Sequence, residues 1–341
     1  MQIPFRTILV AISGLVIANA LSPLIVIPNG DNQYSLLNSI DFHPHLHIVC
    51  VTFTHNNKVS LYTIDQNDPP VCIQTLSNPT ARLREPQHAI FSLDAQKIVV
   101  ANWSNSTLNI YLRKNNGLFS EKPATTIPFP SPLRRSKPHG IAFSPCGQYL
   151  AMACGAANYI EKGLALFRHQ QNDLKWISYL RDNEVPGIPK GICFSPDGTH
   201  LLVTFSEPSA LCIFSIENGE IQPTPKQTLQ GADTGLSRPE DVKMSPDGTN
   251  CAVSNSTRDT VTFYAFDPKA NRIIANCPLW TLANPEAQLS FPHGIAFSPD
   301  GTYLAITQFG RVQVTPEGDI LWPSTLSPQE GTFNLYLLKQ K

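Results

Sequence analysis

One short phrase recurs along this chain at nearly constant intervals and constrains its fold more than any other feature. The phrase is Pro-x-x-aliphatic-x-Phe-Ser-Pro-Asp-Gly, and its prolines lie 50 to 53 residues apart. The first copy matches the phrase at only a few positions, and the second copy matches it in part. The six copies begin at Leu37, Pro86, Pro138, Pro189, Pro239 and Pro292. A period near 50 residues indicates a propeller or a solenoid built from one repeated unit.

Each copy contains four short apolar runs with turn residues between them. In the copy from Pro189, ICF leads into the turn Asp197-Gly198, HLLVTF follows, and ALCIF comes after a few polar residues. A fourth, weaker run precedes the next proline. Two strands joined by Asp-Gly predict a hairpin, in which the aspartate has a structural role, and four strands per period predict a propeller blade. No helical spacing is sustained, and the 30 prolines suit turns. We therefore predict an all-β, six-bladed β-propeller with four-stranded antiparallel blades.

The ring of blades needs a closure, because a blade exposes apolar faces until a neighbour stacks on each side. The sixth copy ends after the run FNLYLL near Phe333 and lacks a fourth strand. The segment from Leu24 to Pro28, LIVIP, lies just before the first copy, where a fourth strand precedes each later copy. We predict that this N-terminal strand joins the C-terminal blade, so that residues 21–341 form a single domain.

The first 20 residues have the features of a signal peptide. They carry one positive charge, an apolar run that is too short for a confident membrane span, and the small-x-small sequence Ala18-Asn19-Ala20. We expect cleavage there and no membrane span in the mature chain. A periplasmic or secreted location is therefore favoured. The eight scattered cysteines show no disulfide pattern and keep a cytoplasmic location open.

Charge excludes one class of partner. The net charge is −1 at pH 7, the pI is about 6.7, and no basic run extends beyond Arg134 and Arg135. Nothing here favours a phosphate backbone, so we predict no nucleic-acid binding. The expected partner is a small polar molecule or a protein, and the chain is expected to be a monomer.

One mouth of the central channel is the predicted functional region. The first strand of a blade is innermost, so the residue after each repeat proline is expected to face the channel. In blade order this ring is Asn38, Gln87, His139, Lys190, Glu240 and His293. His88 follows at the next position of the second blade. Such a cluster suits a small polar or anionic ligand, or a histidine acting near neutral pH. The alternative is a solvent-filled channel mouth in which the charged side chains pair with one another and bind no ligand.

The links between the second and third strands point to the same face. They bring Asn102, Asn255, Glu207 and Arg258, and we expect the two asparagines to bond the local backbone. In the sixth blade this link runs from Phe309 to Gly331, much longer than elsewhere. Its run VQVTPEGDILW alternates around a Pro-Glu-Gly turn. We therefore predict an ordered hairpin flap that bears Arg311 and Trp322.

The runs IVVANWSNSTLNIY (98–111) and CAVSNSTRDTVTFYAF (251–266), which follow the repeat phrase, resemble the YVTN-type repeats of bacterial β-propellers. That group includes lactonase-like propellers related to 6-phosphogluconolactonase, and the resemblance covers nearly everything from Leu24 onward. It implies a site of His, Arg and Glu residues at the strand-start face. The elements Pro138-His139 and Pro292-His293 correspond to its Pro-His element, and Glu207 nearly matches its glutamate. Lys190 stands where an arginine is implied.

Two functions follow from these observations. The first is a binding or interaction module that holds a small polar ligand or a protein at the channel mouth. Its expected ligand-binding residues are Lys190, Glu240, His88, Arg258, Arg311 and Trp322. The alternative is a lactonase-type hydrolase, with expected catalytic residues His139, His293 and Glu207. In this alternative a histidine is the general base, and Lys190 or Arg258 stabilises the oxyanion. The histidines are not in metal-ligand spacing, so we predict no metal and no cofactor.

Overall fold

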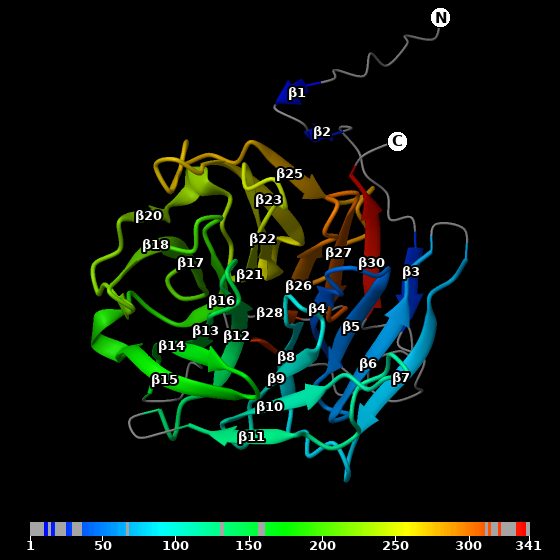
Figure 1. The fold of residues 1–341 in the computed structure, drawn as a ribbon. Coiled ribbons are helices and arrows are strands. Elements are labelled where there is room, and N and C mark those ends of the chain that lie inside the picture. The colour runs from blue at the N-terminus through cyan, green and yellow to red at the C-terminus, as the bar shows by residue number, and fades with distance from the viewer. Residues whose placement is uncertain are drawn as a thin grey trace, which may run out of the picture.

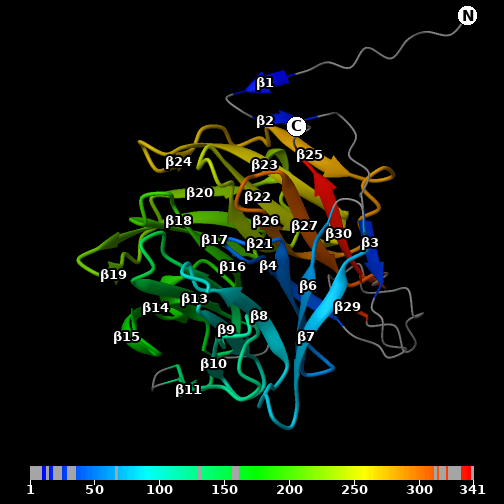
Figure 2. The ribbon, with the colours of Figure 1, turned by 45° about the vertical axis from the view of Figure 1, so that its right-hand side comes forward.

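The protein is an all-β ring of blades around a central channel (Figure 1). Its computed structural model describes residues 10–12, 15–17, 25–28, 36–65, 68–129, 133–155, 161–310, 313–314, 320–321 and 332–338. Within these residues there are six sheets of four or more strands. Figures 1 and 2 show these blades following one another around the ring. The predicted all-β, six-bladed propeller is confirmed.

The first three blades follow the chain order without interruption. Blade one contains β4 (Leu37–Phe42), β5 (Ile48–Phe53), β6 (Lys58–Thr63) and β7 (Val71–Ser77). Blade two contains β8 (Pro86–Phe91), β9 (Lys97–Asn102), β10 (Thr107–Leu112) and β11 (Thr125–Pro128). Blade three contains β12 (Pro138–Phe143), β13 (Tyr149–Cys154), β14 (Gly163–Gln170) and β15 (Asp173–Leu180). In each blade the first strand begins at the start of a repeat phrase.

The fourth and fifth blades each add a short extra strand to the third strand. Blade four contains β16 (Pro189–Phe194), β17 (His200–Phe205), β18 (Ala210–Glu217), β19 (Glu220–Ile221) and β20 (Gln227–Gln230). Blade five contains β21 (Pro239–Met244), β22 (Asn250–Asn255), β23 (Thr260–Asp267), β24 (Arg272–Ile273) and β25 (Trp280–Ala283). In the described links, three short 3₁₀ helices are present: η1 (Asp182–Glu184), η2 (Ala232–Thr234) and η3 (Ser256–Arg258).

Blade six is assembled from both ends of the chain. It contains β26 (Pro292–Phe297), β27 (Tyr303–Gln308), β30 (Thr332–Leu337) and, on the outside, β3 (Ile25–Pro28). Strand β3 is antiparallel to β30, with Ile27 opposite Phe333. Figure 1 shows the blue β3 beside the red β30. The predicted closure by the N-terminal strand is confirmed. It also pairs the otherwise open edge of β30.

The core lies between neighbouring blades. One buried cluster joins Leu164 of blade three to Val203 of blade four, and another joins Ile40 of blade one to Leu335 of blade six. All four side chains are fully buried. Burying one such aliphatic side chain contributes about 1.5–3 kcal/mol, and each blade obtains this gain only from a neighbour. This is the physical reason why the ring closes.

The Asp-Gly turns lie at the end of each blade away from the strand-one starts. The Asp197 carboxylate accepts hydrogen bonds from the Ser195 hydroxyl at 2.6 Å and from the Thr199 amide at 3.0 Å. Gly198 follows with φ of +73°, a conformation that glycine adopts without strain. These bonds confirm the structural role predicted for the aspartate.

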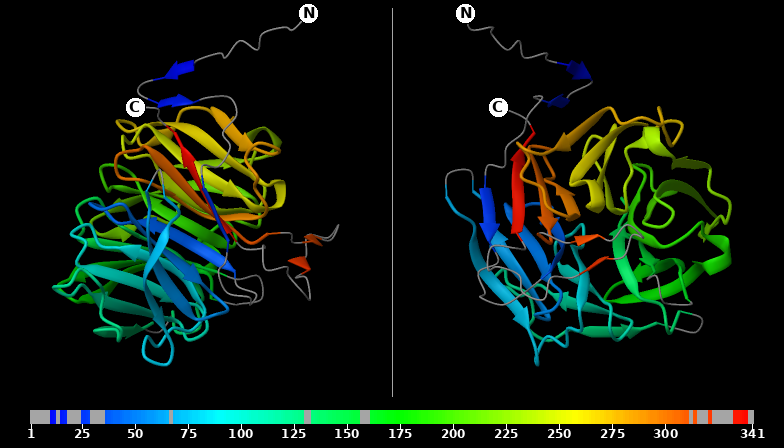
Figure 3. Two further views of the ribbon diagram at one scale, coloured as in Figure 1. Left: turned by 90° about the vertical axis from the view of Figure 1, so that its right-hand side faces the viewer. Right: turned by 180° about the vertical axis from the view of Figure 1, so that it is seen from behind.

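The flap and the N-terminal segment are described only in part. Strand β28 (Gln313–Val314) pairs with β29 (Ile320–Leu321), so the predicted hairpin is confirmed at these positions; Figure 3 shows the pair projecting from the ring. Arg311 and Trp322 lie outside the described residues. At the other end, β1 (Val10–Ile12) pairs with β2 (Leu15–Ile17), and the rest of the predicted signal peptide lies outside the described residues. Among the described residues, no helix has the length and apolarity needed to cross a membrane.

Candidate functional site

A bulge at the start of each first strand directs the site residues toward the channel. The pairing register of the first and second strands shifts between Pro189 and Ile192, and it shifts at the start of the repeat phrase in every blade. Glycine is needed in this bulge where two blades approach closely. A Cβ on Gly191 would lie 2.4 Å from the Cα of Asp241 in the next blade. The first strands therefore come close enough for the residues beside the bulge to touch across the channel.

Glu240 is the centre of the resulting cluster. Its Oε2 lies 3.3 Å from Lys190 Nζ, 3.4 Å from His293 Nε2 and 3.7 Å from His139 Nε2. Lys190 Nζ also donates to His139 Nε2 at 3.3 Å. Glu240 is only 3% exposed, and both histidines are buried. We call Lys190, His139, Glu240 and His293 the mouth cluster; its members come from blades three to six.

The environment of the mouth cluster separates its groups into charged and neutral ones. Burial opposes ionisation of Glu240, but the positive charges of Lys190 and Arg238 hold its pKa below the usual value. Burial, with Lys190 beside it, lowers the pKa of His139 well below the usual value. Burial also lowers the pKa of His293, although the Glu240 carboxylate opposes this shift. At neutral pH the cluster therefore holds one carboxylate and two uncharged imidazoles.

Aromatic and backbone contacts fix the two imidazoles. His293 Nδ1 lies 2.9 Å from the carbonyl oxygen of Asn38, so this nitrogen carries the proton and Nε2 presents a lone pair to the cluster. The His293 ring stacks on Phe309 with a centroid distance of 4.4 Å. The His139 ring lies edge-on to Trp103 at 6.3 Å and tilted to His293 at 5.2 Å. Both rings are held in one orientation.

An outer ion pair extends the mouth cluster toward solvent. Arg238 Nε lies 3.8 Å from Glu240 Oε1, and an Arg238 terminal nitrogen donates to Glu207 Oε1 at 2.9 Å. The Glu207 side chain is 54% exposed. The carboxylate among the histidines is thus Glu240, and Glu207 reaches the cluster only through Arg238. Two positive and two negative side chains balance in this set.

The remaining predicted site residues lie around the cluster. His88 is buried in the channel, where its Nδ1 accepts a hydrogen bond from the Ile141 amide at 3.4 Å. Arg258 lies on η3 with an exposed side chain, and no ion pair joins it to the cluster among the described residues. Asn102 and Asn255 accept hydrogen bonds from the backbone amides of Arg84 and Ser237, as predicted for strand-ending asparagines.

Sequence reasoning missed three residues of the site: Arg238, Trp103 and Phe309. Arg238 directly precedes the repeat proline of blade five, so its place in the repeat could have flagged it. Phe309 begins the long link of blade six, and Trp103 directly follows Asn102, which has the same position in its blade as Asn255. No local pattern indicates that their rings lie against His293 and His139.

The mouth cluster has the donor atoms of a metal site. The ligand atoms of His139, Glu240 and His293 all lie within 4.8 Å of one another, although the two histidines are 154 positions apart in the sequence. The prediction of no metal rested on the spacing of the histidines along the sequence. The fold brings these distant residues together, so that argument against a metal site does not apply. Two imidazoles and a carboxylate are a donor set that zinc uses. The Lys190 ammonium lies 3.3 Å from two of these atoms, so a metal ion would have to displace it.

Little empty space remains inside the ring formed by the channel-facing residues. The cavity that His139, Glu240, His293 and their neighbours line has a volume of about 10 Å³. This is room for about one water molecule. Any larger ligand must lie on the outer side of the cluster, where Lys190 is the most exposed member, with 14% of its side chain accessible.

The sequence matches the family described as Lactonase, 7-bladed beta-propeller over residues 40–315. The chain belongs to this family. This lactonase family membership confirms the resemblance carried by the repeats. The family description counts seven blades, whereas the described residues of this chain form six. No curated protein matches the sequence.

Several solved lactonase-like propellers have a similar fold. The periplasmic gluconolactonase of Pseudomonas aeruginosa is 16% identical, with a TM-score of 0.60 over 89% of this chain and 88% of its own. A gluconolactonase of Xanthomonas campestris is 12% identical, with a TM-score of 0.60 over 95% and 90%. A putative 6-phosphogluconolactonase of Bacteroides uniformis is 17% identical, with a TM-score of 0.55 over 92% and 85%. At these identities the likeness concerns the fold alone.

Proposed function

We propose that this protein is a lactone hydrolase that acts at the mouth cluster. One observation carries the proposal: the Nε2 atoms of two imidazoles and one ammonium converge on a single buried carboxylate oxygen, each 3.3–3.7 Å from it. Membership of the lactonase family supports this function over the binding module that ranked first on sequence alone. A base and a cationic donor side by side are what water addition to an ester carbonyl requires.

In the proposed reaction His139 is the general base. Its Nε2 takes a proton from a water molecule held at the cluster, and the water oxygen attacks the lactone carbonyl carbon. The Lys190 ammonium donates a hydrogen bond to the oxygen on which negative charge develops. Glu240 stabilises the imidazolium that forms, since its Oε2 lies 3.7 Å from His139 Nε2.

The ring of the lactone then opens. The tetrahedral carbon re-forms its carbonyl and breaks the bond to the ring oxygen, and the imidazolium returns its proton to that oxygen. The product is an open-chain hydroxy acid, and its carboxyl group releases one proton to solvent at neutral pH, which the assay below detects. His293 is the alternative base, because its protonated Nδ1 is anchored to Asn38 and its Nε2 is free to accept a proton.

We propose an uncharged, polyhydroxylated sugar lactone as the substrate. The channel-facing ring adds the amides of Asn38 and Gln87, which hydrogen-bond to each other and suit sugar hydroxyl groups. The charges of Lys190 and Arg238 are matched by Glu240 and Glu207. No cation is therefore left over in this set for a phosphate group, and this balance favours the unphosphorylated lactone.

The experiment is a panel of lactones assayed by proton release. Glucono-δ-lactone and its 6-phosphate are the main pair, and the comparison includes His139→Ala, His293→Ala and the double variant. Loss of a general base lowers turnover by about 10²–10⁴-fold. His45→Ala is the control, because His45 is exposed and lies beside the turn end of blade one. Activity that is absent from the wild type, or unchanged in the double variant, rules out the hydrolase and restores the binding module.

A further inference from the structure

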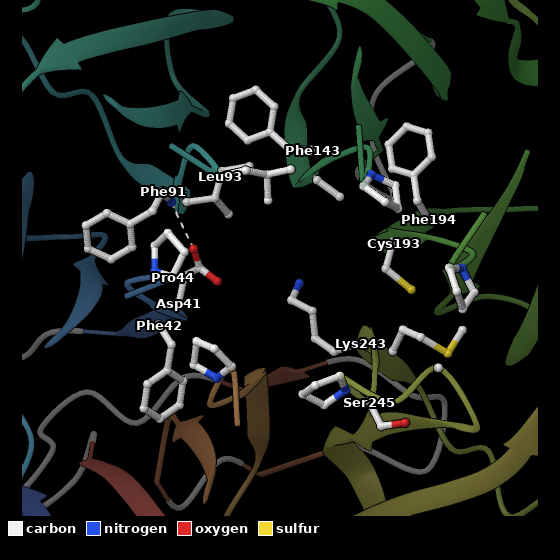
Figure 4. A pocket seen from close by; sticks show the side chains of 18 of the residues that line it. Asp41, Phe42, Pro44, Phe91, Leu93, Phe143, Cys193, Phe194, Lys243 and Ser245 are labelled. Atoms are coloured by element: carbon white, nitrogen blue, oxygen red, sulfur yellow. Dashed lines mark hydrogen bonds between the residues drawn. The ribbon is translucent and has the colours of Figure 1, made fainter. Parts of the chain in front are cut away.

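The channel contains a second cavity at the end opposite the mouth cluster. It has a volume of about 480 Å³, within the range of small-molecule sites, and Figure 4 shows it from close by. Glu240 and Lys243 are three residues apart on β21, and Lys243 lines this cavity. A strand rises about 3.3 Å per residue, so the two sites are separated by roughly 10 Å along the channel.

Two rings of repeat positions form the cavity wall. The outer ring comes from the eighth position of the repeat phrase: Pro44, Leu93, Pro145, Pro196, Pro246 and Pro299. The inner ring comes from the fourth residue after the repeat proline, and it includes Ile90, Ala142 and Cys193. The outer ring is apolar throughout, whereas the inner ring also contains the charged residues Asp41 and Lys243. The repeat phrase therefore builds a largely apolar vestibule that the proposed hydrolase reaction does not use.

Asp41 and Lys243 are the only charged side chains among the described residues that line this cavity. Lys243 Nζ is already paired with Asp241 Oδ1 at 3.1 Å, and that carboxylate also accepts from the amides of Val242 and Ile295. Asp41 has no ion pair among the described residues. Its Oδ2 accepts from the Phe91 amide at 2.9 Å, and Figure 4 shows the carboxyl group and the Lys243 ammonium directed toward the open middle.

The charge of this wall is thus set by Asp41. Lys243 forms its ion pair with Asp241, and among the described residues no cation lies within ion-pair distance of Asp41, although the Lys243 charge acts on it from farther away. Burial raises the pKa of Asp41 from 3.8 to about 7, which expresses the cost of holding an unpaired carboxylate there. A ligand that brings a positive charge would remove that cost.

We propose that this cavity binds a small organic amine, with its ammonium group on Asp41 and its apolar body against the ring of prolines. The ammonium donates to the Asp41 carboxylate, and the proline faces accept a flat or aliphatic body. An anionic ligand would face the same unpaired carboxyl group, and a neutral alcohol would leave its charge uncompensated. The site is separate from the mouth cluster and does not depend on the hydrolase function.

Isothermal titration calorimetry with three ligands of one shape tests this proposal. Benzylamine, benzyl alcohol and phenylacetate share an aromatic body and differ in the charge of the head group. At pH 8 we expect saturable binding of benzylamine, at least ten-fold tighter than binding of the other two. The wild-type measurements alone can overturn the proposal. They do so if phenylacetate binds more tightly than benzylamine, or if benzylamine shows no saturable binding.

Two variants locate the site. Asp41→Asn keeps the size of the side chain and an acceptor for the Phe91 amide, and we expect it to weaken benzylamine binding at least ten-fold. Glu207→Gln changes an acid at the opposite mouth and should leave benzylamine binding unchanged. If Glu207→Gln weakens benzylamine binding and Asp41→Asn does not, the amine binds at the mouth cluster and the proposed cavity site is wrong.

Binding should also depend on pH in a defined direction. An Asp41 group with a pKa near 7 is about one-tenth ionised at pH 6 and about nine-tenths ionised at pH 8. The charged or ionisable groups that act on it are Lys243, Asp241 and the Cys50 thiol. Benzylamine affinity should therefore rise about ten-fold from pH 6 to pH 8, and an affinity that is constant over this range contradicts the role of Asp41.

Discussion

Glu240→Gln removes the carboxylate on which the mouth cluster is built. The Lys190 ammonium at 3.3 Å and the Arg238 guanidinium at 3.8 Å then lose their shared buried partner. At an effective dielectric constant of about 20, each of these contacts corresponds to roughly 4–5 kcal/mol of Coulomb attraction before desolvation. Removing one member of a buried pair costs about 3–5 kcal/mol in measured cases.

Two features of the site reduce this cost. Lys190 is 14% exposed and can turn toward water, and Arg238 keeps its contact with Glu207 at 2.9 Å. We therefore expect Glu240→Gln to lower the free energy of unfolding by about 2–4 kcal/mol. Urea denaturation followed by tryptophan fluorescence measures this change. Glu207→Gln is the matched control, because an exposed pair contributes about 0–1 kcal/mol.

A double variant separates charge from packing. Lys190→Met together with Glu240→Gln removes both charges of the pair, so the combined loss should be at least about 1 kcal/mol smaller than the sum of the two single losses. The reasoning is refuted if Glu240→Gln is no less stable than Glu207→Gln. It is also refuted if the two single effects simply add.

Four further outcomes follow from the structure. Deletion through Pro28 should leave the chain unfolded or aggregated, because β3 completes blade six; a soluble product with native circular dichroism would contradict this. Gly191→Ala should destabilise the fold by about 1–3 kcal/mol or more in urea, since its Cβ would meet the Asp241 Cα at 2.4 Å; a neutral effect would show that the blades can move apart. The folded-state pKa of Asp41 is raised, so the wild type binds this proton more tightly when folded and loses stability as pH rises from about 4 to about 7, by up to roughly 4 kcal/mol. Asp41→Asn should lack that loss and be the more stable protein at pH 8. The same dependence of the free energy of unfolding on pH in both proteins would contradict this reasoning. Lys190→Ala should bind Co²⁺ with the visible absorption of a tetrahedral site, because it frees the space between two imidazoles and a carboxylate; adding His293→Ala should abolish that absorption, and a signal that survives it would place the metal elsewhere.

The blade architecture could be predicted from the sequence because its causes are local. Alternating apolar residues, Asp-Gly turns and the missing fourth strand near Phe333 can each be recognised within a few residues of sequence. The number of copies of the repeat phrase gives the number of blades. The same register placed His139, Lys190, Glu240 and His293 on one ring. The sequence therefore predicted which side chains face the mouth.

The roles within that ring could be decided only in three dimensions. His293 meets the Asn38 carbonyl across 255 positions of sequence, and this contact exists only because the ring closes. Closure also makes Glu240 rather than Glu207 the carboxylate between the histidines, and it adds Arg238, which no motif marked.

The sequence by itself determined the number of blades, the strand that closes the ring and the positions that face the channel, because these depend on short-range periodicity and turn chemistry. The tertiary structure decided which charges are paired and which are not. Lys243 is paired with Asp241, whereas Asp41 faces the cavity and forms no ion pair with any described residue, although Lys243 and Asp41 occupy the same repeat position. Pairing depends on distances and desolvation across the channel, and a linear pattern contains neither.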